Sequence, residues 1–259
     1  TGVIMMTAYE DFKTVITSMK NGASDYLVKP LDIEELEIII EKALENIRLK
    51  RELEELRKQY IQEFDIDQIV AESRGIKDAL KLANTIAQSD DTTALIEGET
   101  GTGKEVIART IHCHSRRFGK PFVSINCGAI SKELIESELF GYEKGTFTGG
   151  LQEGKKGKIE LAESGTLFLD EISELLPYSQ VNLLRFLEEK EFYRVGGTEK
   201  RKVDVRIIAA TNKSLEEGIA KGTFRKDLYY RLNVAKIFLP PLRDRKADII
   251  ALVRFFMNK

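Results

Sequence analysis

The residues that point most directly to chemistry form one glycine-rich turn, which reads Gly98, Glu99, Thr100, Gly101, Thr102, Gly103, Lys104 and Glu105. An apolar run at 94–96 precedes the turn, and a helix-prone run at 105–111 follows it. Backbone N–H groups in such a turn converge on one concavity, and the start of a helix adds partial positive charge, so the turn favours an anion. Lys104 supplies a cation for outer phosphates. The pattern predicts a phosphate-binding loop; a lysine beside an ordinary flexible loop is the alternative.

Two neighbouring carboxylates, Asp170 and Glu171, form the second candidate group. They follow the apolar run 166–169, which predicts a strand with both carboxylates at its carboxyl end, the edge where an open parallel sheet binds ligands. Asp170 then holds Mg²⁺ directly or through water, and Glu171 polarises an attacking water. The general phosphate-loop pattern has a magnesium-binding hydroxyl after the lysine, whereas this chain has Glu105 there. A solvated acidic turn is the alternative for the two carboxylates.

Two asparagines and two arginines complete the candidate set. Asn126 and Asn212 each end an apolar strand; either side chain bonds a carboxylate or the γ-phosphate, or simply caps a helix. Arg225 and Arg231 lie on the helix predicted at 224–232. They either face solvent or reach the nucleotide of an adjacent subunit, where an arginine stabilises charge during phosphoryl transfer. Residue types and spacing leave both pairs of alternatives open.

The elements that position these residues alternate between strands and helices. Apolar runs predict strands at 69–70, 92–96, 121–126, 166–171, 205–210 and 237–239. Helical patterns lie at 75–87, 104–114, 133–140, 178–190, 224–232 and from 248 onward, and the glycine-rich stretch 141–158 predicts a long loop. Repeated strand–helix units predict an α/β fold built on an open parallel sheet. His112 and His114 face different sides of their helix, so we expect solvated histidines rather than a metal site.

The first 68 residues have a different pattern. Apolar runs predict short strands at 3–6 and 26–28 with a helix at 10–19 between them, and a helix without Gly or Pro runs from 31 to about 63. Apolar positions step by three and four along that helix in two sets: Leu36, Ile40, Ala43 and Ile47, then Leu49, Leu53, Leu56 and Tyr60. This broken heptad favours a dimeric coiled coil for the second set, whereas the first set fits a coiled coil and an amphipathic helix packed on its own domain about equally well. Residues 1–30 are expected to pack poorly by themselves.

Composition excludes several classes of protein. The 40 Lys and Arg residues are balanced by 42 Asp and Glu residues, so no overall basic field exists to hold DNA. The chain of 259 residues, 42% of them hydrophobic, suits a globular protein. Cys113 and Cys127 have no metal-like spacing and indicate incidental thiols in a reducing cytoplasm. Neither a membrane-spanning run nor a signal peptide is present, and the start at Thr1, directly before an apolar strand, predicts a fragment.

From residue 69 to the end, about three-quarters of its length, the chain resembles the central AAA+ domain of NtrC-like bacterial enhancer-binding proteins, the activators of sigma-54 RNA polymerase. Several motifs carry the resemblance: 98–105 as the Walker A motif, which also ends in glutamate in that family; 138–143; 165–171 as Walker B; Thr211 and Asn212 as the first sensor; 224–232 as the arginine-finger segment; and 240–245 as the start of the helical lid. The resemblance implies a three-layer α/β ATPase that takes ATP and Mg²⁺ and assembles into a hexameric or heptameric ring.

Roles for single residues follow from the same resemblance. Asp170 is implied to lie near Mg²⁺, and Glu171 to activate water. Asn126 is implied to restrain Glu171 until the nucleotide changes, and Asn212 to sense the nucleotide. Arg225 and Arg231 are implied to act from the adjacent subunit.

A hexapeptide at 145–150 departs from the family pattern. The family sequence is GAFTGA, which contacts sigma-54, and here Thr146 and Gly150 replace its alanines while Phe147 and Thr148 remain. An apolar tip framed by glycines suits a retractable probe that touches the sigma factor. A mobile loop with an incidental phenylalanine is the alternative.

The opening segment resembles the C-terminal half of a two-component receiver domain. Thr7 matches its switch hydroxyl, Tyr26 its switch aromatic, and Lys29 its lysine. Lys29–Pro30 is a candidate cis peptide. The acidic pair and the phosphoacceptor aspartate of such domains are expected upstream of this sequence; ordinary strand-end residues are the alternative.

Four parts are predicted: 1–30, part of a receiver; 31–68, a helical dimerisation linker; 69–240, the AAA+ α/β ATPase; and 241–259, the start of a helical lid. The predicted function is a response regulator that hydrolyses ATP to remodel sigma-54 holoenzyme, held off by its receiver until phosphorylation. An ATP-binding switch that does not engage sigma-54 is the alternative, favoured by the altered hexapeptide, and a DNA-binding repressor is disfavoured by charge. DNA contact is expected only through a C-terminal helix-turn-helix beyond this sequence.

Overall fold

The computed structural model describes residues 3–7, 23, 25–63, 71–145 and 154–257, and the chain divides into two compact units, Thr1–Glu63 and Phe64–Lys259. None of the helices in these described ranges has the length and apolar character needed to cross a bilayer. The predicted helix at 10–19 and the predicted strand at 69–70 lie outside the described residues.

The second unit is built on five parallel strands in the order β11–β3–β10–β7–β4. Their bounds are β3, Ala94–Gly98; β4, Phe122–Asn126; β7, Thr166–Asp170; β10, Arg206–Thr211; and β11, Ala235–Leu239. All five strands were predicted from apolar runs, within a few residues at each end. Because the strands are parallel, their carboxyl ends share one edge of the sheet, which is where ligands bind in such folds.

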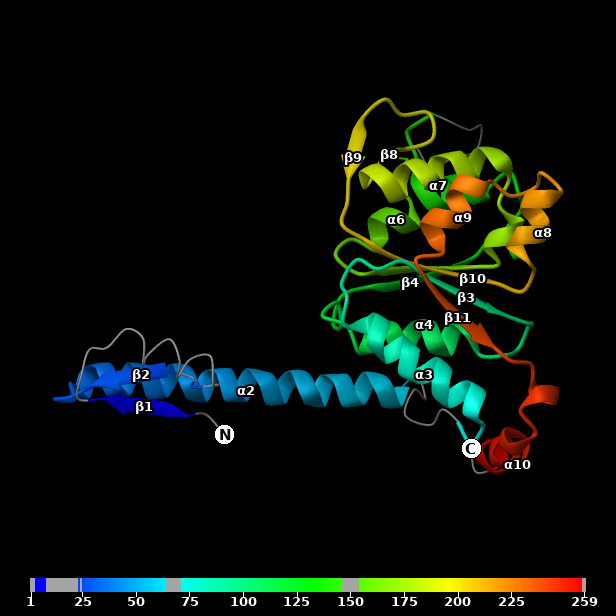
Figure 1. Ribbon diagram of the computed structural model, residues 1–259. Coiled ribbons are helices and arrows are strands. Elements are labelled where there is room, and N and C mark those ends of the chain that lie inside the picture. The colour runs from blue at the N-terminus through cyan, green and yellow to red at the C-terminus, as the bar shows by residue number, and fades with distance from the viewer. Residues whose placement is uncertain (1–2, 8–22, 24, 64–70, 146–153, 258–259) are drawn as a thin grey trace. The chain divides into compact units, whose positions relative to one another are not determined.

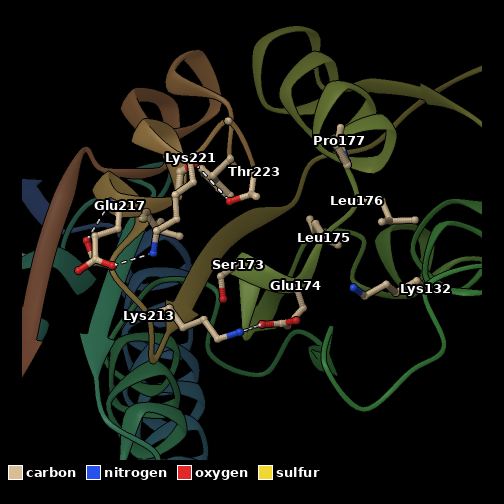
Figure 2. Close-up of a pocket in the computed structure, with 15 residues that line it drawn as sticks. Lys132, Ser173, Glu174, Leu175, Leu176, Pro177, Lys213, Glu217, Lys221 and Thr223 are labelled. Carbon is tan, nitrogen blue, oxygen red and sulfur yellow. Dashed lines mark hydrogen bonds and ion pairs between the residues drawn. The ribbon is translucent and has the colours of Figure 1, made fainter.

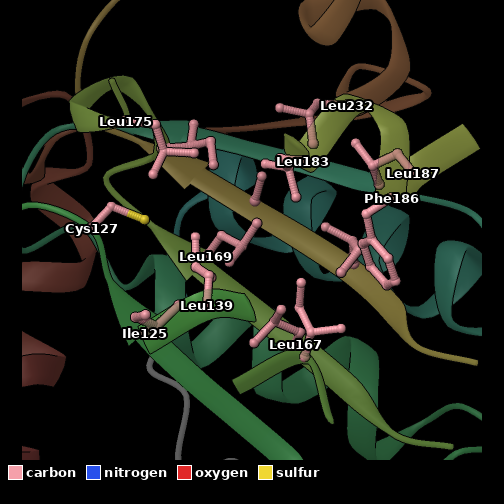
Figure 3. Close-up of a cluster of buried hydrophobic side chains, with 14 of the residues drawn as sticks. Ile125, Cys127, Leu139, Leu167, Leu169, Leu175, Leu183, Phe186, Leu187 and Leu232 are labelled. Carbon is pink, nitrogen blue, oxygen red and sulfur yellow. The ribbon is translucent and has the colours of Figure 1, made fainter. Parts of the chain in front are cut away.

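Alternation along the strands builds a hydrophobic core on each face of this sheet. Leu167 and Leu169 of β7 face one cluster, which Figure 3 shows, whereas Phe168 between them faces the other. The first cluster includes residues of α5 (Ile135–Phe140), α6 (Lys158–Leu161), α7 (Pro177–Glu189) and α9 (Lys226–Leu232). The second includes residues of α3 (Arg74–Ala87) and α4 (Lys104–Cys113). The result is the predicted three-layer fold (Figure 1).

Smaller elements complete this unit. They are η2 (Ile172–Glu174), α8 (Leu215–Ala220), η3 (Leu242–Asp244), α10 (Lys246–Met257) and the antiparallel pair β8 (Glu191–Tyr193) and β9 (Lys200–Lys202). A second antiparallel pair, β5 (Gly141–Tyr142) with β6 (Lys155–Lys156), lies within the predicted loop 141–158. The prediction of a loop throughout was therefore wrong. Its glycines allow two backbones to approach closely: a Cβ on Gly157 would lie 2.3 Å from Leu139 O.

His112 corrects a second expectation. Its side chain is buried, with Nδ1 2.9 Å from Thr166 Oγ1 and its ring edge-to-face with Phe122. Burial, followed by the charges of Arg206 and Arg109, lowers the pKa of His112 to about 4. It is therefore a neutral core residue, not a solvated one, because α4 buries this side against the sheet. His114 is half-buried and donates from Nδ1 to Thr110 O.

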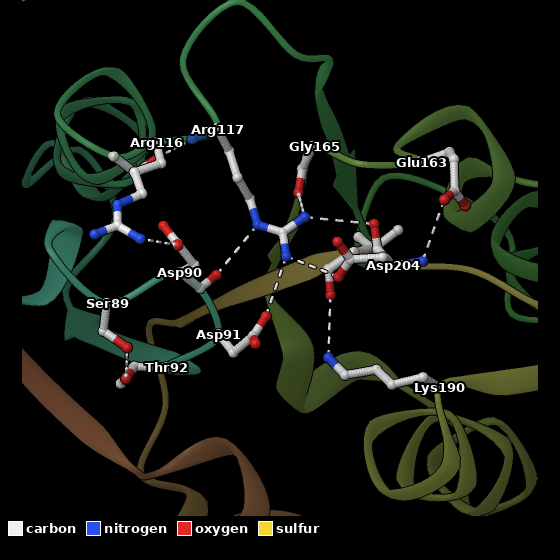
Figure 4. Close-up of polar contacts among 12 residues, drawn as sticks. Ser89, Asp90, Asp91, Thr92, Arg116, Arg117, Glu163, Gly165, Lys190 and Asp204 are labelled. Carbon is white, nitrogen blue, oxygen red and sulfur yellow. Dashed lines mark hydrogen bonds and ion pairs between the residues drawn. The ribbon is translucent and has the colours of Figure 1, made fainter.

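Arg117 ties together the loops at the opposite, amino-terminal end of the strands (Figure 4). Its guanidinium is buried and contacts Asp204 Oδ1 at 2.7 Å and Asp91 Oδ1 at 3.1 Å, and it also donates to the Gly165 and Asp90 carbonyls. These contacts connect the segments that precede β3, β7 and β10. The network stabilises the sheet at a distance from the edge where the predicted site residues lie.

Asp248 links the C-terminal part of this unit to its first helix. The carboxylate is fully buried and accepts hydrogen bonds from Glu72 N at 2.8 Å, Ser73 N at 2.7 Å and Ser73 Oγ at 2.7 Å. Ser73 is the N-cap residue of α3. Asp248 therefore fixes the two residues immediately ahead of α3 from a distant position in the sequence, where the positive end of the helix dipole also favours a carboxylate.

The first unit contains β1 (Ile4–Thr7), which pairs in parallel with β2 (Asp25–Val28), and a long helix, α2 (Ile33–Glu63). At 1.5 Å per residue this helix is about 46 Å long. In the described residues of this unit, Leu27 and Ile39 are the buried apolar side chains, while Ile38, Ile40, Leu44 and Leu49 are exposed.

Candidate functional site

The glycine-rich turn lies between β3 and α4 in the second unit. Gly101 and Gly103 have φ values of 79° and 97°, a region that favours glycine. Gly98 packs where a Cβ would lie 2.8 Å from both Leu239 O and Thr102 Oγ1. Thr102 closes the turn by donating from Oγ1 to Glu99 O at 2.7 Å. The glycines therefore serve the predicted purpose, since they allow a tight turn at the start of a helix.

Lys104 is held at the centre of this turn. Its Nζ donates to the carbonyls of Gly98 at 2.9 Å and Glu99 at 3.0 Å, and the residue is buried. Burial lowers the pKa of Lys104, while the charges of Asp170 and Glu171 oppose that shift. The structure thus brings the lysine within electrostatic reach of the two carboxylates, as expected for adjacent parts of one site.

Asp170 and Glu171 stand at the carboxyl end of β7. Asp170 is in register with Asn126 on β4, and its Oδ1 accepts from Glu171 N at 2.9 Å. Glu171 has a left-handed conformation with φ of 52° and is the N-cap residue of η2. Such a conformation costs a non-glycine residue roughly 1–2 kcal/mol and is common at functional sites. Burial, with the charges of Asp170 and Glu171 next, raises the pKa of neighbouring Cys127 to about 12, so this residue is a neutral thiol.

Asn126 and Glu171 meet at Gly128. The Asn126 Oδ1 atom accepts from Gly128 N at 2.8 Å and from Ala129 N at 2.9 Å. A Cβ on Gly128 would lie 2.0 Å from Glu171 Oε2. Asn126 therefore closes the turn against which the Glu171 carboxylate rests, while these two hydrogen bonds reach neither that carboxylate nor the start of a helix.

Asn212 follows β10 and contacts the glycine-rich turn. Its Nδ2 donates to Thr100 Oγ1 at 3.1 Å, while its buried Oδ1 has no hydrogen-bond partner within the described residues. Thr211 before it is fully buried and bonds the backbone of Lys213. The structure thus brings together Lys104, Asp170, Glu171, Asn126 and Asn212 at one sheet edge.

Two arginines that sequence reasoning did not single out also hold the turn. Arg243 forms a two-pronged ion pair with Glu99, with contacts of 2.8 and 2.5 Å. Arg245 is buried and donates from Nη2 to Thr102 O at 3.0 Å. Both lie in the segment 240–245, which the sequence motif marks as the start of a lid. The motif therefore pointed to this segment, but it did not reveal that the arginines contact the turn. Glu105 pairs with Arg109, one turn further along α4, at 2.7 Å.

Arg225 and Arg231 lie elsewhere in the described structure. Arg225 is exposed, is the N-cap residue of α9, and pairs with Asp227 at 2.6 Å. With Lys226, Asp227 and Tyr230 it lines an open hollow of about 460 Å³. Arg231 is exposed in the last turn of α9. The predicted helix at 224–232 begins only at Lys226, because Arg225 keeps an extended backbone.

The remaining site predictions are in other regions. Phe147 and Thr148 lie outside the described residues. In the first unit, Lys29 N donates to Thr7 O at 2.8 Å, Tyr26 is exposed, and the Lys29–Pro30 peptide is cis, as predicted. The backbone therefore brings the predicted switch residues Thr7 and Lys29 together at the ends of β1 and β2.

The residues present at the sheet edge fit a nucleotide and a divalent cation. A Cβ on Gly101 or Gly103 would meet nothing within 4 Å, so the mouth of the turn is open to a ligand. The buried ammonium of Lys104 suits the phosphate oxygens of a nucleotide, and the orphaned Oδ1 of Asn212, which is an acceptor, suits a donor such as a water beside the nucleotide. Asp170 offers the type of oxygen ligand that Mg²⁺ takes alongside phosphates. No cluster of three or more metal-ligating side chains occurs in the described ranges.

The parallel sheet, the phosphate-binding turn after β3 and the carboxylates after β7 define a P-loop α/β fold of the AAA+ class. The family model for the sigma-54 interaction domain matches residues 69–238. The chain therefore belongs to the sigma-54 interaction domain family.

Relatives extend the similarity over the whole chain. The regulatory protein AtoC of Escherichia coli (strain K12) is 47% identical over 259 residues, which are 100% of this chain and 56% of that protein. The DNA-binding transcriptional regulator NtrC of the same strain is 44% identical over 256 residues, 99% of this chain and 53% of its own length. The chain is thus NtrC-like, and it spans about half the length of these curated relatives.

Solved structures show the same similarity. NtrX from Brucella abortus is 38% identical, with a TM-score of 0.68 over 99% of this chain and 55% of that one. The same protein in complex with ATP is 36% identical, with a TM-score of 0.67 over 99% of this chain and 54% of that one.

Proposed function

We propose that this chain is the ATP-hydrolysing part of a sigma-54-dependent transcriptional activator that acts in the cytoplasm. The observation that carries the proposal is the convergence of Lys104, Asp170, Glu171 and Asn212 at one edge of the sheet. The family match and the ATP complex of NtrX support adenine nucleotide as the ligand.

The residues of the site divide the chemistry between them. The turn 98–105 holds the phosphates of ATP with its backbone N–H groups, and Lys104 exchanges its bonds to Gly98 O and Glu99 O for the outer phosphates. Glu171 orients and polarises the attacking water, and Asn126 holds the turn against Glu171. Asp170 is the residue that would hold Mg²⁺, which neutralises charge on the phosphates when bound. Asn212 senses the phosphate beside Thr100.

We assign Arg225 and Arg231 to the nucleotide of an adjacent subunit. Both are exposed on α9, away from the contacts that hold Lys104 and Glu171 in the described structure. An arginine supplied from a neighbour stabilises transition-state charge and is worth about 10³–10⁵ in rate in well-studied phosphoryl-transfer enzymes. The active form is a hexameric or heptameric ring.

The output of hydrolysis is assigned to Phe147 and Thr148. They lie between the β5 and β6 strands in sequence, so this pair connects the hexapeptide to the rest of the ATPase unit. The proposed partner is sigma-54 of RNA polymerase, with Thr146 and Gly150 in place of the alanines of the family hexapeptide.

The N-terminal parts are assigned to regulation: 1–30 as part of a receiver with Thr7, Tyr26 and Lys29 as switch residues, and 31–68 as a dimerisation linker. Ile40 and Leu49, which belong to the two sets of stepped apolar positions, are exposed on α2, and this supports pairing with a second copy. The units 69–240 and 241–259 are the ATPase and the start of its lid. DNA contact belongs to a helix-turn-helix outside this sequence.

The test combines one substitution with one titration. Glu171→Gln is expected to bind ATP with near wild-type affinity and to lose turnover, because the amide cannot accept a proton from water. Turnover per subunit in the wild type is expected to rise steeply with protein concentration if the arginines act between subunits. Unchanged hydrolysis by Glu171→Gln contradicts the assignment of the water-activating group, and a photo-crosslinker at residue 147 that captures no sigma-54 contradicts the partner.

A further inference from the structure

Gln180 is a fully buried polar side chain that the mechanism above does not use. It lies in the first turns of α7, and its side-chain amide joins two segments on either side of that helix. Nε2 donates to Leu175 O at 2.8 Å and to Thr223 O at 2.9 Å, and Oε1 accepts from Arg225 N at 2.8 Å. Two acceptor carbonyls and one donor N–H fix the orientation of the amide without ambiguity.

The two joined segments belong to different parts of the proposed chemistry. Leu175 is the C-cap residue of η2, whose N-cap residue is Glu171. Arg225 is the N-cap residue of α9, which carries Arg231 at its other end. A single amide therefore connects the turn after the water-activating carboxylate with the backbone from which the arginine segment starts.

Packing and hydrogen bonds share this connection. Leu175 and Thr223 line the same cavity of about 590 Å³, together with Glu174 and Lys213, as Figure 2 shows. Leu175 and Phe224 are both buried in the first hydrophobic cluster, and Thr223 N and Phe224 N donate to Gly218 O. Gln180 adds the acceptor for the backbone N–H of Arg225, the N-cap position of α9.

We infer that Gln180 is a positioning residue. It holds the arginine segment in the position needed at the nucleotide site of the next subunit, and it couples the position of that segment to the conformation of Glu171 in its own subunit. The inference rests on the proposed function, because it needs arginines that act between subunits. Gln180 touches no nucleotide; it fixes where Arg225 begins. A displacement of about 1 Å at a catalytic group costs on the order of 100-fold in rate, so one lost anchor has a large effect.

Mixed rings test this inference. Gln180→Met keeps the volume of the side chain and removes all three hydrogen bonds; Gln180→Glu keeps the acceptor for Arg225 N and loses the amide donors. Alone, each variant is expected to bind ATP normally and to turn over about 10- to 100-fold more slowly, with kcat rather than KM affected. Asn182→Ala is the matched control, because this second amide on α7 bonds the Glu136 side chain instead of the two segments.

Subunits with Glu171→Gln are then added to subunits with Gln180→Met. The former cannot hydrolyse ATP but carry a correctly set arginine segment, and the latter have an intact site. Turnover in the mixture is expected to exceed the summed turnover of the two separate preparations. In the mixture, the intact nucleotide sites of Gln180→Met subunits receive arginines from Glu171→Gln subunits, whose arginine segments are correctly positioned. A purely additive result, or a kcat equal to that of wild type for both Gln180 variants, overturns the inference.

The controls separate this outcome from failure of the proposed function. A wild-type protein without ATP turnover, or with turnover per subunit independent of concentration, overturns the proposed function and the inference together. A third outcome assigns Gln180 to the fold alone. In it, turnover in the mixtures is additive, Gln180→Met has a lowered midpoint of thermal unfolding, and Gln180→Glu folds normally and keeps full turnover.

Discussion

Asn212 Nδ2 lies 3.1 Å from Thr100 Oγ1, so the residue after β10 donates a hydrogen bond to the turn after β3. The two strands are neighbours in the sheet, with Thr211 in register with Glu97. The amide therefore rests on the glycine-rich turn itself, while its Oδ1 has no partner among the described residues. In the proposed function, this contact is the route by which a change in the nucleotide reaches β10.

Asn212→Ala is expected to reduce kcat by about 100-fold, because in the proposed function it removes a donor that senses the reacting phosphate. ATP affinity is expected to change much less, since Lys104 and the turn remain. Steady-state turnover and equilibrium binding of a fluorescent ATP analogue measure the two quantities. Thr100→Val is the control: it breaks the same hydrogen bond from the other side and keeps Asn212. Equal losses in both variants would show that the contact, and not the asparagine, is what matters.

Gly128→Ala probes the placement of Glu171. The added Cβ would lie 2.0 Å from Glu171 Oε2, so the carboxylate must move. We expect kcat to fall by about 10- to 100-fold, because the water-activating group is displaced, while ATP binding is retained. Combined with Glu171→Gln, Gly128→Ala is expected to cause no further loss. A further loss in that double variant would place the effect of the methyl group elsewhere.

Arg117 and its neighbour Arg116 form a natural pair for testing stability. Arg117→Ala is expected to lower the free energy of unfolding by about 2–4 kcal/mol, because buried carbonyls and two aspartates lose a shared donor. Arg116, whose side chain is 84% exposed beside Asp90, is expected to contribute less than about 1 kcal/mol. Urea unfolding of the two alanine variants measures the difference. Equal effects would show that the network in Figure 4 adds no stability beyond a surface pair.

His112 predicts a specific dependence of stability on pH. Its pKa in the folded chain is about 4, below the ordinary value of 6.5, because the ring is buried. Below pH 6.5 the unfolded chain binds a proton that the folded chain does not, so stability falls as the pH decreases from 6.5 to about 4 and this contribution then levels off. The full difference corresponds to about 3 kcal/mol.

His112→Gln is expected to flatten this part of the stability curve, measured by urea unfolding between pH 7 and pH 4.5. His114→Gln, on the same helix, is the control for exchanging an imidazole for an amide. A wild-type slope retained in His112→Gln would show that another group takes up the proton.

The main architecture was predictable because it depends on local patterns. Runs of apolar residues marked all five sheet strands, and the glycines of 98–103 marked the turn, where Gly101 and Gly103 have the positive φ values that favour glycine. The order of the strands, and with it the contact between Asn212 and Thr100, depends on which strands pair. No local pattern determines that pairing.

Contacts between distant segments account for what sequence reasoning missed. The charges of Arg243 and Arg245 resemble those of any exposed helix start, and only the fold brings them to Glu99 and Thr102. Gln180 looks like an ordinary helix residue, yet burial makes its three hydrogen bonds structurally important. His112 was misjudged for the same reason, because helical spacing does not reveal which face the sheet covers.

The contact between Asp248 and the entrance to α3 has a practical consequence for dissecting this protein. The carboxylate that holds Glu72 N and Ser73 N, immediately ahead of α3, lies 175 positions after Ser73 in the sequence. A shortened ATPase that stops at residue 240 would keep every strand of the five-stranded sheet and every proposed catalytic side chain, yet it would lose Asp248 together with Arg243 and Arg245, which hold the glycine-rich turn. Weak nucleotide binding by such a fragment would then report the loss of these supports and not a defect in the catalytic side chains.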